Sequence, residues 1–283
     1  CATLPPLSDS ATMIVKYYKD KFATIKSLVE KQAMSKEMAI IVDALAALKV
    51  NIIIAGETNT LKTTLLSALA KKVPQNNNGV IFDYSNELKV EKSNIITYDF
   101  KNYQNETLIK NVIESNPNRI FLNDCPNLEY FEKFIENGYR GICATLNVNN
   151  PYDVLQKIYL RNTDVIIFTK KNEQKRYISS LSLAKGSELE DIFYLNEQNE
   201  YKSTGIVPEF FNSMEKSQLP ISGAVFEADY KHTFHTSAQN EASENFAKKS
   251  INTEILKKFK KDINKKENTI QENKNSIEQE NNE

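Results

Sequence analysis

The stretch Asn51-Ile-Ile-Ile-Ala-Gly-Glu-Thr-Asn-Thr-Leu-Lys-Thr-Thr64 decides the fold class of this chain. Residues 51–55 form an almost wholly apolar run, which is typical of a strand buried on both faces of a parallel sheet. Residues 56–61 read as a loop, and residues 62–72 have the composition of a helix. A buried strand, a short loop and a helix are the surroundings in which a phosphate-binding loop (P-loop) is found.

The residue types in the loop agree with phosphate binding. Backbone N–H groups of such a loop and of the following helix surround phosphates, a lysine reaches the outer phosphates, and a hydroxyl ligates Mg²⁺. We therefore expect ATP and Mg²⁺ as cofactors, with Lys62 on the phosphates and Thr63 on the metal. The predicted nucleotide-binding residues are Gly56, Thr58, Asn59, Thr60, Leu61, Lys62, Thr63 and Thr64.

One position departs from the pattern Gly-x4-Gly-Lys-Ser/Thr, because Leu61 stands where the second glycine belongs. A left-handed backbone at Leu61 would cost about 1–2 kcal/mol. Its side chain would also crowd the place where phosphate approaches. The alternative is an ordinary strand–turn–helix that carries a surface lysine.

The rest of the chain alternates between strand-like and helical segments. Strand-like runs lie at 12–18, 80–83, 95–98, 120–122, 142–146 and 165–168, and helical stretches at 24–31, 36–48, 106–115, 128–137 and 152–160. This alternation predicts an α/β sheet with helices on both faces. The later runs at 176–183 and 192–195 alternate in polarity, so we expect antiparallel strands at one edge.

Composition excludes some classes of function. The chain has 283 residues, of which 40% are hydrophobic and 26% charged, and its formal net charge is −1. A near-zero charge argues against binding nucleic acid or anionic lipid through the overall field. Three cysteines are too few for a disulfide framework. Residues 248–283 are rich in Lys, Asn, Glu and Gln, which favours a solvated, partly helical tail over a coiled coil.

Several segments resemble, in order and spacing, the ATPase core of the type II/IV secretion family, and within it the CpaF/TadA-type motors of pilus assembly. They are Leu4-Pro-Pro-Leu7 with Met13-Ile-Val-Lys16, Asn51-Ile-Ile-Ile-Ala-Gly56, Phe82-Asp-Tyr-Ser-Asn-Glu-Leu88 (acidic box), Asn116-Pro-Asn-Arg-Ile-Phe-Leu-Asn-Asp124 (Walker B segment), Asn137-Gly-Tyr-Arg-Gly-Ile-Cys-Ala-Thr-Leu-Asn147 (His box) and Thr204-Gly-Ile-Val-Pro208. The resemblance extends over residues 4–226.

The departures from the family fall on the chemistry. Asp124 stands at the Walker B glutamate position, Asp83 at the acidic-box glutamate, and Asn147 at the histidine of the His box. Both aspartates follow apolar strands, where metal and water ligands lie in P-loop sheets. We expect Asp124, Asp83, Asn147 and Arg119 as catalytic residues, and Thr63 and Asp124 as ligands of Mg²⁺. Arg119 is one of only four arginines in the chain.

The resemblance implies a RecA-like core at 34–218, after a flanking segment at 1–33 and before an extension at 219–247. It implies a cytoplasmic ring, a hexamer of this chain or a mixed ring with a paralogue, beneath an inner-membrane pilus or secretion platform. The resemblance includes no counterpart of the family's separate N-terminal domain, so we expect a truncated chain or a partial gene. The function implied is a motor ATPase. The alternatives are a catalytically impaired ring subunit and an unrelated P-loop scaffold, such as a polynucleotide-binding protein.

Three smaller features have plain interpretations. His232 and His235 have the spacing of one helix face but no third ligand nearby, so we interpret them as solvated rather than as a zinc site. Cys125 and Cys143 are expected to be buried and inert. The residues Lys170, Lys171, Lys175 and Arg176 form a basic edge, either solvated or in contact with a neighbouring subunit's nucleotide.

Overall fold

The computed structural model describes residues 2–6, 9–13, 24–88, 90–100, 106–124, 129–150, 153–154, 163–173, 175–185, 188–210 and 223–226. All of them lie in the first of two compact units, Cys1–Tyr230; the second is Lys231–Glu283. The predicted tail at 248–283 and the two histidines therefore fall outside the described residues, as do Cys125 and most of the predicted helix at 152–160.

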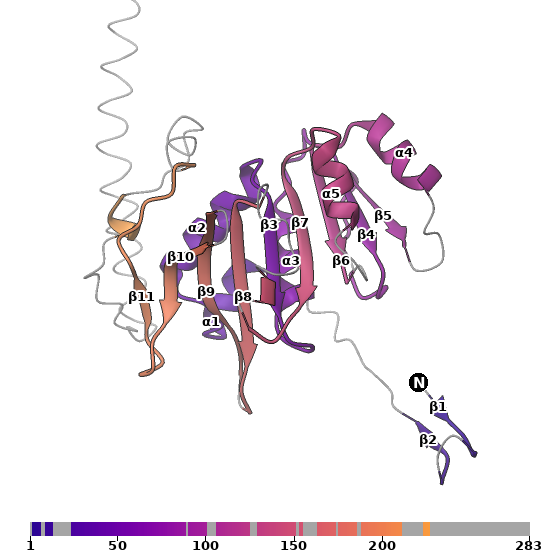
Figure 1. Ribbon diagram of the computed structural model, residues 1–283, viewed down its shortest axis with the longest axis horizontal. Coiled ribbons are helices and arrows are strands. Elements are labelled where there is room, and N and C mark those ends of the chain that lie inside the picture. The colour runs from indigo at the N-terminus through magenta and orange to yellow at the C-terminus, as the bar shows by residue number, and fades with distance from the viewer. Residues whose placement is uncertain are drawn as a thin grey trace, which may run out of the picture. The chain divides into compact units, whose positions relative to one another are not determined.

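A nine-stranded sheet dominates the described residues (Figure 1). Its strands in chain order are β3 (Ile52–Gly56), β4 (Gly79–Asp83), β5 (Ile95–Asp99), β6 (Arg119–Asn123), β7 (Ile142–Asn147), β8 (Val165–Lys171), β9 (Arg176–Lys185), β10 (Glu188–Leu195) and β11 (Tyr201–Ser203). The spatial order is β11-β10-β9-β8-β3-β7-β6-β4-β5. Two short strands, β1 (Ala2–Thr3) and β2 (Thr12–Met13), form a separate antiparallel ribbon.

Strand directions confirm the predicted fold class. The six strands from β8 to β5 pair in parallel, whereas β8, β9, β10 and β11 pair successively antiparallel. The chain is thus an α/β protein with a mostly parallel, RecA-like sheet and an antiparallel edge. Of the strand predicted at 12–18, the structure describes only the two residues of β2, and β1 and β11 were not predicted.

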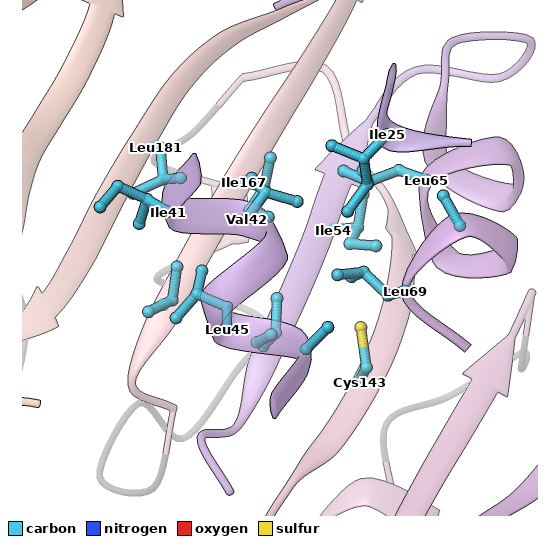
Figure 2. Packing of buried hydrophobic residues seen from close by; sticks show 14 of the residues in the cluster. Ile25, Ile41, Val42, Leu45, Ile54, Leu65, Leu69, Cys143, Ile167 and Leu181 are labelled. Carbon is cyan, nitrogen blue, oxygen red and sulfur yellow. The ribbon is translucent and has the colours of Figure 1, made fainter. Parts of the chain in front are cut away.

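Helices cover both faces of the sheet (Figure 1). The helices are α1 (Ile25–Glu30), α2 (Lys36–Ala47), α3 (Lys62–Lys71), α4 (Glu106–Ser115) and α5 (Glu129–Glu136). The first three share one core cluster, part of which is drawn in Figure 2, and α4 and α5 share the other. Helix α2 begins where predicted, because the Ser35 hydroxyl accepts a hydrogen bond from the Met38 amide at 3.1 Å.

Strand β3 explains why its sequence is apolar throughout. Its side chains alternate between the two clusters: Ile52 and Ile54 pack with α1–α3, and Ile53 and Ala55 pack with α4 and α5. All four are at most 2% exposed. The prediction of a strand buried on both faces is confirmed.

Parallel pairing brings the ends of several strands to one edge of the sheet. Gly56 lies opposite Asn147 on β7 and Thr169 on β8, and Asp83 on β4 lies opposite Asn123 on β6. The carboxyl edge of a parallel sheet is where ligands bind in such folds. No helix among the described residues is long and apolar enough to span a membrane.

Candidate phosphate-binding site

The P-loop leaves β3 at Gly56, where only glycine fits. Its φ is +149°, and a Cβ atom there would lie 2.2 Å from the carbonyl oxygen of Thr169 and 2.4 Å from its hydroxyl. The left-handed residue of the loop is Asn59, with φ +60°. Asparagine tolerates this conformation better than most residues.

Leu61 does not adopt the left-handed backbone of a P-loop glycine. Its φ and ψ are −97° and 5°, so the cost that a left-handed leucine would carry does not arise. The side chain is 8% exposed and belongs to the core cluster of α1–α3. Because the isobutyl group is buried in the core, the expectation that it crowds the phosphate approach is wrong.

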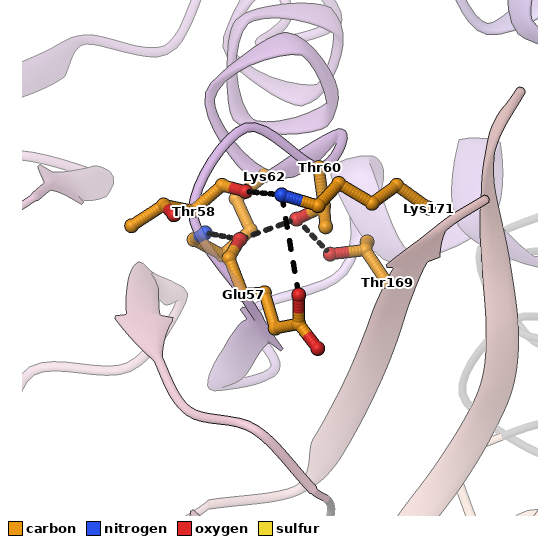
Figure 3. Close-up of polar contacts among 6 residues, drawn as sticks. All are labelled: Glu57, Thr58, Thr60, Lys62, Thr169 and Lys171. Atoms are coloured by element: carbon orange, nitrogen blue, oxygen red, sulfur yellow. Dashed lines mark hydrogen bonds and ion pairs between the residues drawn. The ribbon is translucent and has the colours of Figure 1, made fainter. Parts of the chain in front are cut away.

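Lys62, the first residue of α3, turns back over the loop. Its ammonium donates a hydrogen bond to the Glu57 carbonyl at 2.6 Å, and the residue is only 5% exposed (Figure 3). No ion pair forms at this ammonium among the described residues. Burial lowers the pKa of Lys62, an effect that Asp124 opposes and Lys171 reinforces. A buried cation whose partner is a neutral carbonyl is well suited to receive an anion.

The start of α3 is also open to an anion. Leu61 is its N-cap residue and makes no side-chain capping hydrogen bond to the amides of the first turn. Thr63 and Thr64, in that turn, are half-buried, while Thr58 and Asn59 are exposed on the loop.

A pair of threonines ties the loop to the neighbouring strand (Figure 3). The hydroxyls of Thr60 and Thr169 lie 2.7 Å apart, and both threonines are at most 7% exposed. The Thr169 hydroxyl also donates to the Ala55 carbonyl at 3.0 Å. The loop is therefore attached to β8 through side chains as well as through its own strand. Thr169 was not among the predicted site residues.

Asp83 has both carboxylate oxygens occupied within the protein. One oxygen accepts from Asn123 Nδ2 at 2.8 Å and from the Ser85 hydroxyl at 3.1 Å, and the other accepts from the Leu88 amide at 2.7 Å. The residue is 1% exposed. It thus holds the turn after β4. Asn123, which sequence reasoning missed, is fully buried, and its Oδ1 has no partner among the described residues.

Asp124 follows β6 and is brought toward Lys62. Its φ is +50°, and its amide donates to the Thr145 hydroxyl at 2.8 Å. Burial raises the pKa of the Asp124 carboxyl, while the Lys62 ammonium lowers it. The Lys62 ammonium and the Asp124 carboxylate therefore shift each other's pKa.

Two predicted catalytic residues, Asn147 and Arg119, differ in their environment from Asp83 and Asp124. Asn147, at the end of β7, lies beside Gly56 in the sheet but is exposed. Arg119 begins β6, at the opposite edge of the sheet, and is 5% exposed. Its guanidinium donates to the carbonyls of Leu45, at 3.0 Å, and Ala46 at the end of α2. Burial lowers its pKa to about 10. The expected catalytic role of Arg119 is corrected to an internal, structural one.

A magnesium ion would find few protein ligands here. Within the ranges that the structure describes, no group of three or more His, Cys, Asp or Glu side chains could hold a metal. Thr63 and Asp124 fit a Mg²⁺ that takes most of its ligands from water and phosphate, as this ion commonly does.

No family model matches the chain. Over 155 residues it is 24% identical to the type IV secretion system protein VirB11 of Bartonella quintana (strain Toulouse), a match that covers 50% of this chain and 44% of VirB11. This match confirms the resemblance to the secretion ATPases. The chain spans less than half the length of that relative.

Three solved structures are also similar. The VirB11 ATPase of the Brucella suis type IV secretion system, in complex with sulphate, has 19% identity and a TM-score of 0.46, over 56% of this chain and 54% of that one. The pilus retraction motor PilT with bound ADP has 15% identity and a TM-score of 0.49, over 60% of this chain and 55% of PilT. The Legionella pneumophila ATPase DotB has 14% identity and a TM-score of 0.41, over 51% of this chain and 48% of DotB.

Proposed function

We propose that this chain binds Mg-ATP at the P-loop and works as a motor ATPase subunit of a type II/IV secretion or Tad-like pilus-assembly machine. The observation that carries the proposal is the buried ammonium of Lys62, held at the loop by the Glu57 carbonyl and facing no carboxylate within ion-pair distance among the described residues. The sequence similarity to VirB11 supports the kind of machine.

Each loop residue has a task in this proposal. Lys62 exchanges the carbonyl for phosphate oxygens, the amides at the start of α3 bind the phosphates, and Thr63 and Asp124 hold the metal. Bound Mg²⁺ neutralises charge on the phosphate groups. Asp124, whose carboxylate lies in the field of Lys62, orients the attacking water.

Lysine removal tests binding directly. In Lys62→Met, Mg-ATP at 100 times the wild-type Kd should no longer stabilise the protein, whereas in wild type it adds about 2.7 kcal/mol. Lys72→Met is the matched control, because Lys72 pairs with Asp43 and its side chain is 47% exposed. Retention of the full nucleotide-induced shift in Lys62→Met, measured by thermal unfolding, would contradict the proposal.

A second candidate is a catalytically impaired paralogue that keeps nucleotide and serves as a structural or regulatory subunit. The internal engagement of both Asp83 oxygens favours it, since a carboxylate that accepts three hydrogen bonds is poorly free to activate water. Phosphate release separates the two candidates. A silent wild type that gains turnover in Asn147→His supports the paralogue, and measurable turnover in wild type supports the motor.

The assembly is part of the proposal. We expect a hexameric ring of this chain, or a mixed ring with a paralogue, acting in the cytoplasm at an inner-membrane platform protein. Light scattering after size-exclusion chromatography, with and without Mg-ATP, tests ring formation. A particle that stays monomeric under both conditions, even at high protein concentration, would contradict the homomeric ring.

A further inference from the structure

Lys171 brings a second ammonium to the P-loop. It is the last residue of β8, two positions after the threonine that is bonded to the loop. Its Nζ donates to the Thr58 carbonyl at 2.9 Å and lies 4.0 Å from a carboxylate oxygen of Glu57 (Figure 3). From the sequence, Lys171 is expected either in solvent or at a neighbouring subunit's nucleotide, but within this chain it contacts the loop itself.

We infer that Lys171 is a second phosphate-binding cation of this site, reaching the polyphosphate of a nucleotide from the edge strand. The inference rests on the proposed function, and it adds a residue outside the P-loop motif to the binding of the nucleotide.

Two ammonium groups on consecutive carbonyls of one loop are the first argument. Lys62 donates to the Glu57 carbonyl and Lys171 donates to the Thr58 carbonyl, so two positive charges bind to the same loop. Their mutual repulsion contributes to the lowered pKa of Lys62. A phosphate group placed between them would turn this repulsion into attraction.

An ion pair with Glu57 does not explain why the Lys171 ammonium lies at the loop. The carboxylate–ammonium distance of 4.0 Å is at the limit of an ion pair, and the two side chains are 53% and 40% exposed. Such exposed pairs contribute little to stability. The shorter contact is to the Thr58 carbonyl, which orients the ammonium over the loop. Glu57 also adds negative charge beside the loop, so a further cation offsets a repulsion that phosphate would otherwise meet.

Lys170 is a built-in control. It is the neighbouring residue on β8, exposed, and its ammonium lies 5.9 Å from the centre of the Phe168 ring rather than on the loop. A general effect of positive charge at this strand end would be the same for both lysines. An effect of direct phosphate contact would appear for Lys171 alone.

The experiment compares Lys171→Met with Lys170→Met in the wild type and in a Glu57→Gln background. The measurement is the Kd of a fluorescent ATP analogue, and of tripolyphosphate competing with it, in the presence of Mg²⁺. Lys171→Met should weaken both by about tenfold, the loss typical of one charge-assisted hydrogen bond, in both backgrounds. Lys170→Met should stay within twofold of its parent. Lys171→Arg should restore most of the affinity.

Each other result overturns the inference. Equal effects of the two lysines would show a general field, and a loss confined to the background with Glu57 would show that Lys171 only neutralises that carboxylate. If wild type binds the ATP analogue and Lys62→Met weakens that binding but Lys171→Met does not, the proposed function is supported and the inference about Lys171 is refuted. Wild type that binds no nucleotide would remove both. If Lys171→Met fails to fold by circular dichroism, Lys171→Gln replaces it under the same criteria.

Discussion

Replacing Leu61 with glycine would restore the P-loop pattern, yet the structure predicts harm rather than gain. The isobutyl group is 8% exposed and packs in the core cluster of α1–α3. Removing a buried leucine side chain to Ala costs about 2–5 kcal/mol. The added backbone freedom of glycine costs about 0.5–1 kcal/mol more. We expect Leu61→Gly to lose about 3–5 kcal/mol of unfolding free energy.

Nothing on the ligand side compensates for this loss. Because Leu61 is not left-handed, with φ −97°, glycine relieves no backbone strain there. The side chain does not stand in the loop, so its removal opens no space for phosphate. The affinity of the folded variant for Mg-ATP should therefore stay within about threefold of wild type, since a threefold change is under 1 kcal/mol.

Urea unfolding monitored by circular dichroism measures the stability, and a fluorescent nucleotide measures the affinity. Leu61→Met is the control, because a volume-conserving change of this kind costs less than about 1.5 kcal/mol. A glycine variant that is as stable as wild type and binds ATP ten times more tightly would refute the reasoning. Such a result would mean that the leucine occupies the phosphate position.

Three further predictions concern other buried or half-buried groups. Arg119→Met should lower the unfolding free energy by about 2–4 kcal/mol in urea titration, because the carbonyls of Leu45 and Ala46 lose a charged donor, while nucleotide affinity stays unchanged. The raised pKa of Asp124 means that the folded state binds this proton more tightly than the unfolded state, so its contribution to stability falls as pH rises above the unfolded value of about 3.8. Asp124→Asn should therefore gain stability relative to wild type as pH rises from about 3.8 to the higher pKa of the folded state, and by a constant amount above it, in the absence of nucleotide; a difference that shrinks over this rise would contradict the assignment. Burial raises the pKa of Cys143 to about 12, so its peptide should stay unlabelled by iodoacetamide in native protein at pH 8 and become labelled in urea, as mass spectrometry can follow.

The sequence was most informative where one residue type has one physical reason to be present. An apolar run bounded by a glycine required a strand buried on both faces, and β3 has that environment. A serine before an apolar helical pattern required an N-cap, which Ser35 provides. The order of strands and helices then fixed a mostly parallel sheet, because alternating elements pack in few ways.

The site was less predictable because its contacts join residues far apart in the chain. The bonds of Thr60 to Thr169 and of Lys171 to Thr58 span 109 and 113 residues. Neither β8 residue belongs to a local motif. Arg119 was misassigned for a related reason: it lies in the segment that resembles Walker B and is one of only four arginines, but β6 places it at the opposite end of the sheet, against the end of α2.

In this loop, three residues other than glycine determine the path of the backbone. Asn59 supplies the left-handed turn, Leu61 fixes the end of the loop in the core, and Thr60 attaches it to β8. The loop therefore forms without the second glycine of the pattern, and Lys62 donates to the Glu57 carbonyl. The carboxylate of Asp83 differs from these loop residues, because both of its oxygens accept hydrogen bonds within the protein. Binding and hydrolysis should then respond to different substitutions: changes at Lys62 and Lys171 should alter the Kd for ATP, whereas changes around Asp83 should alter stability and turnover more than the Kd.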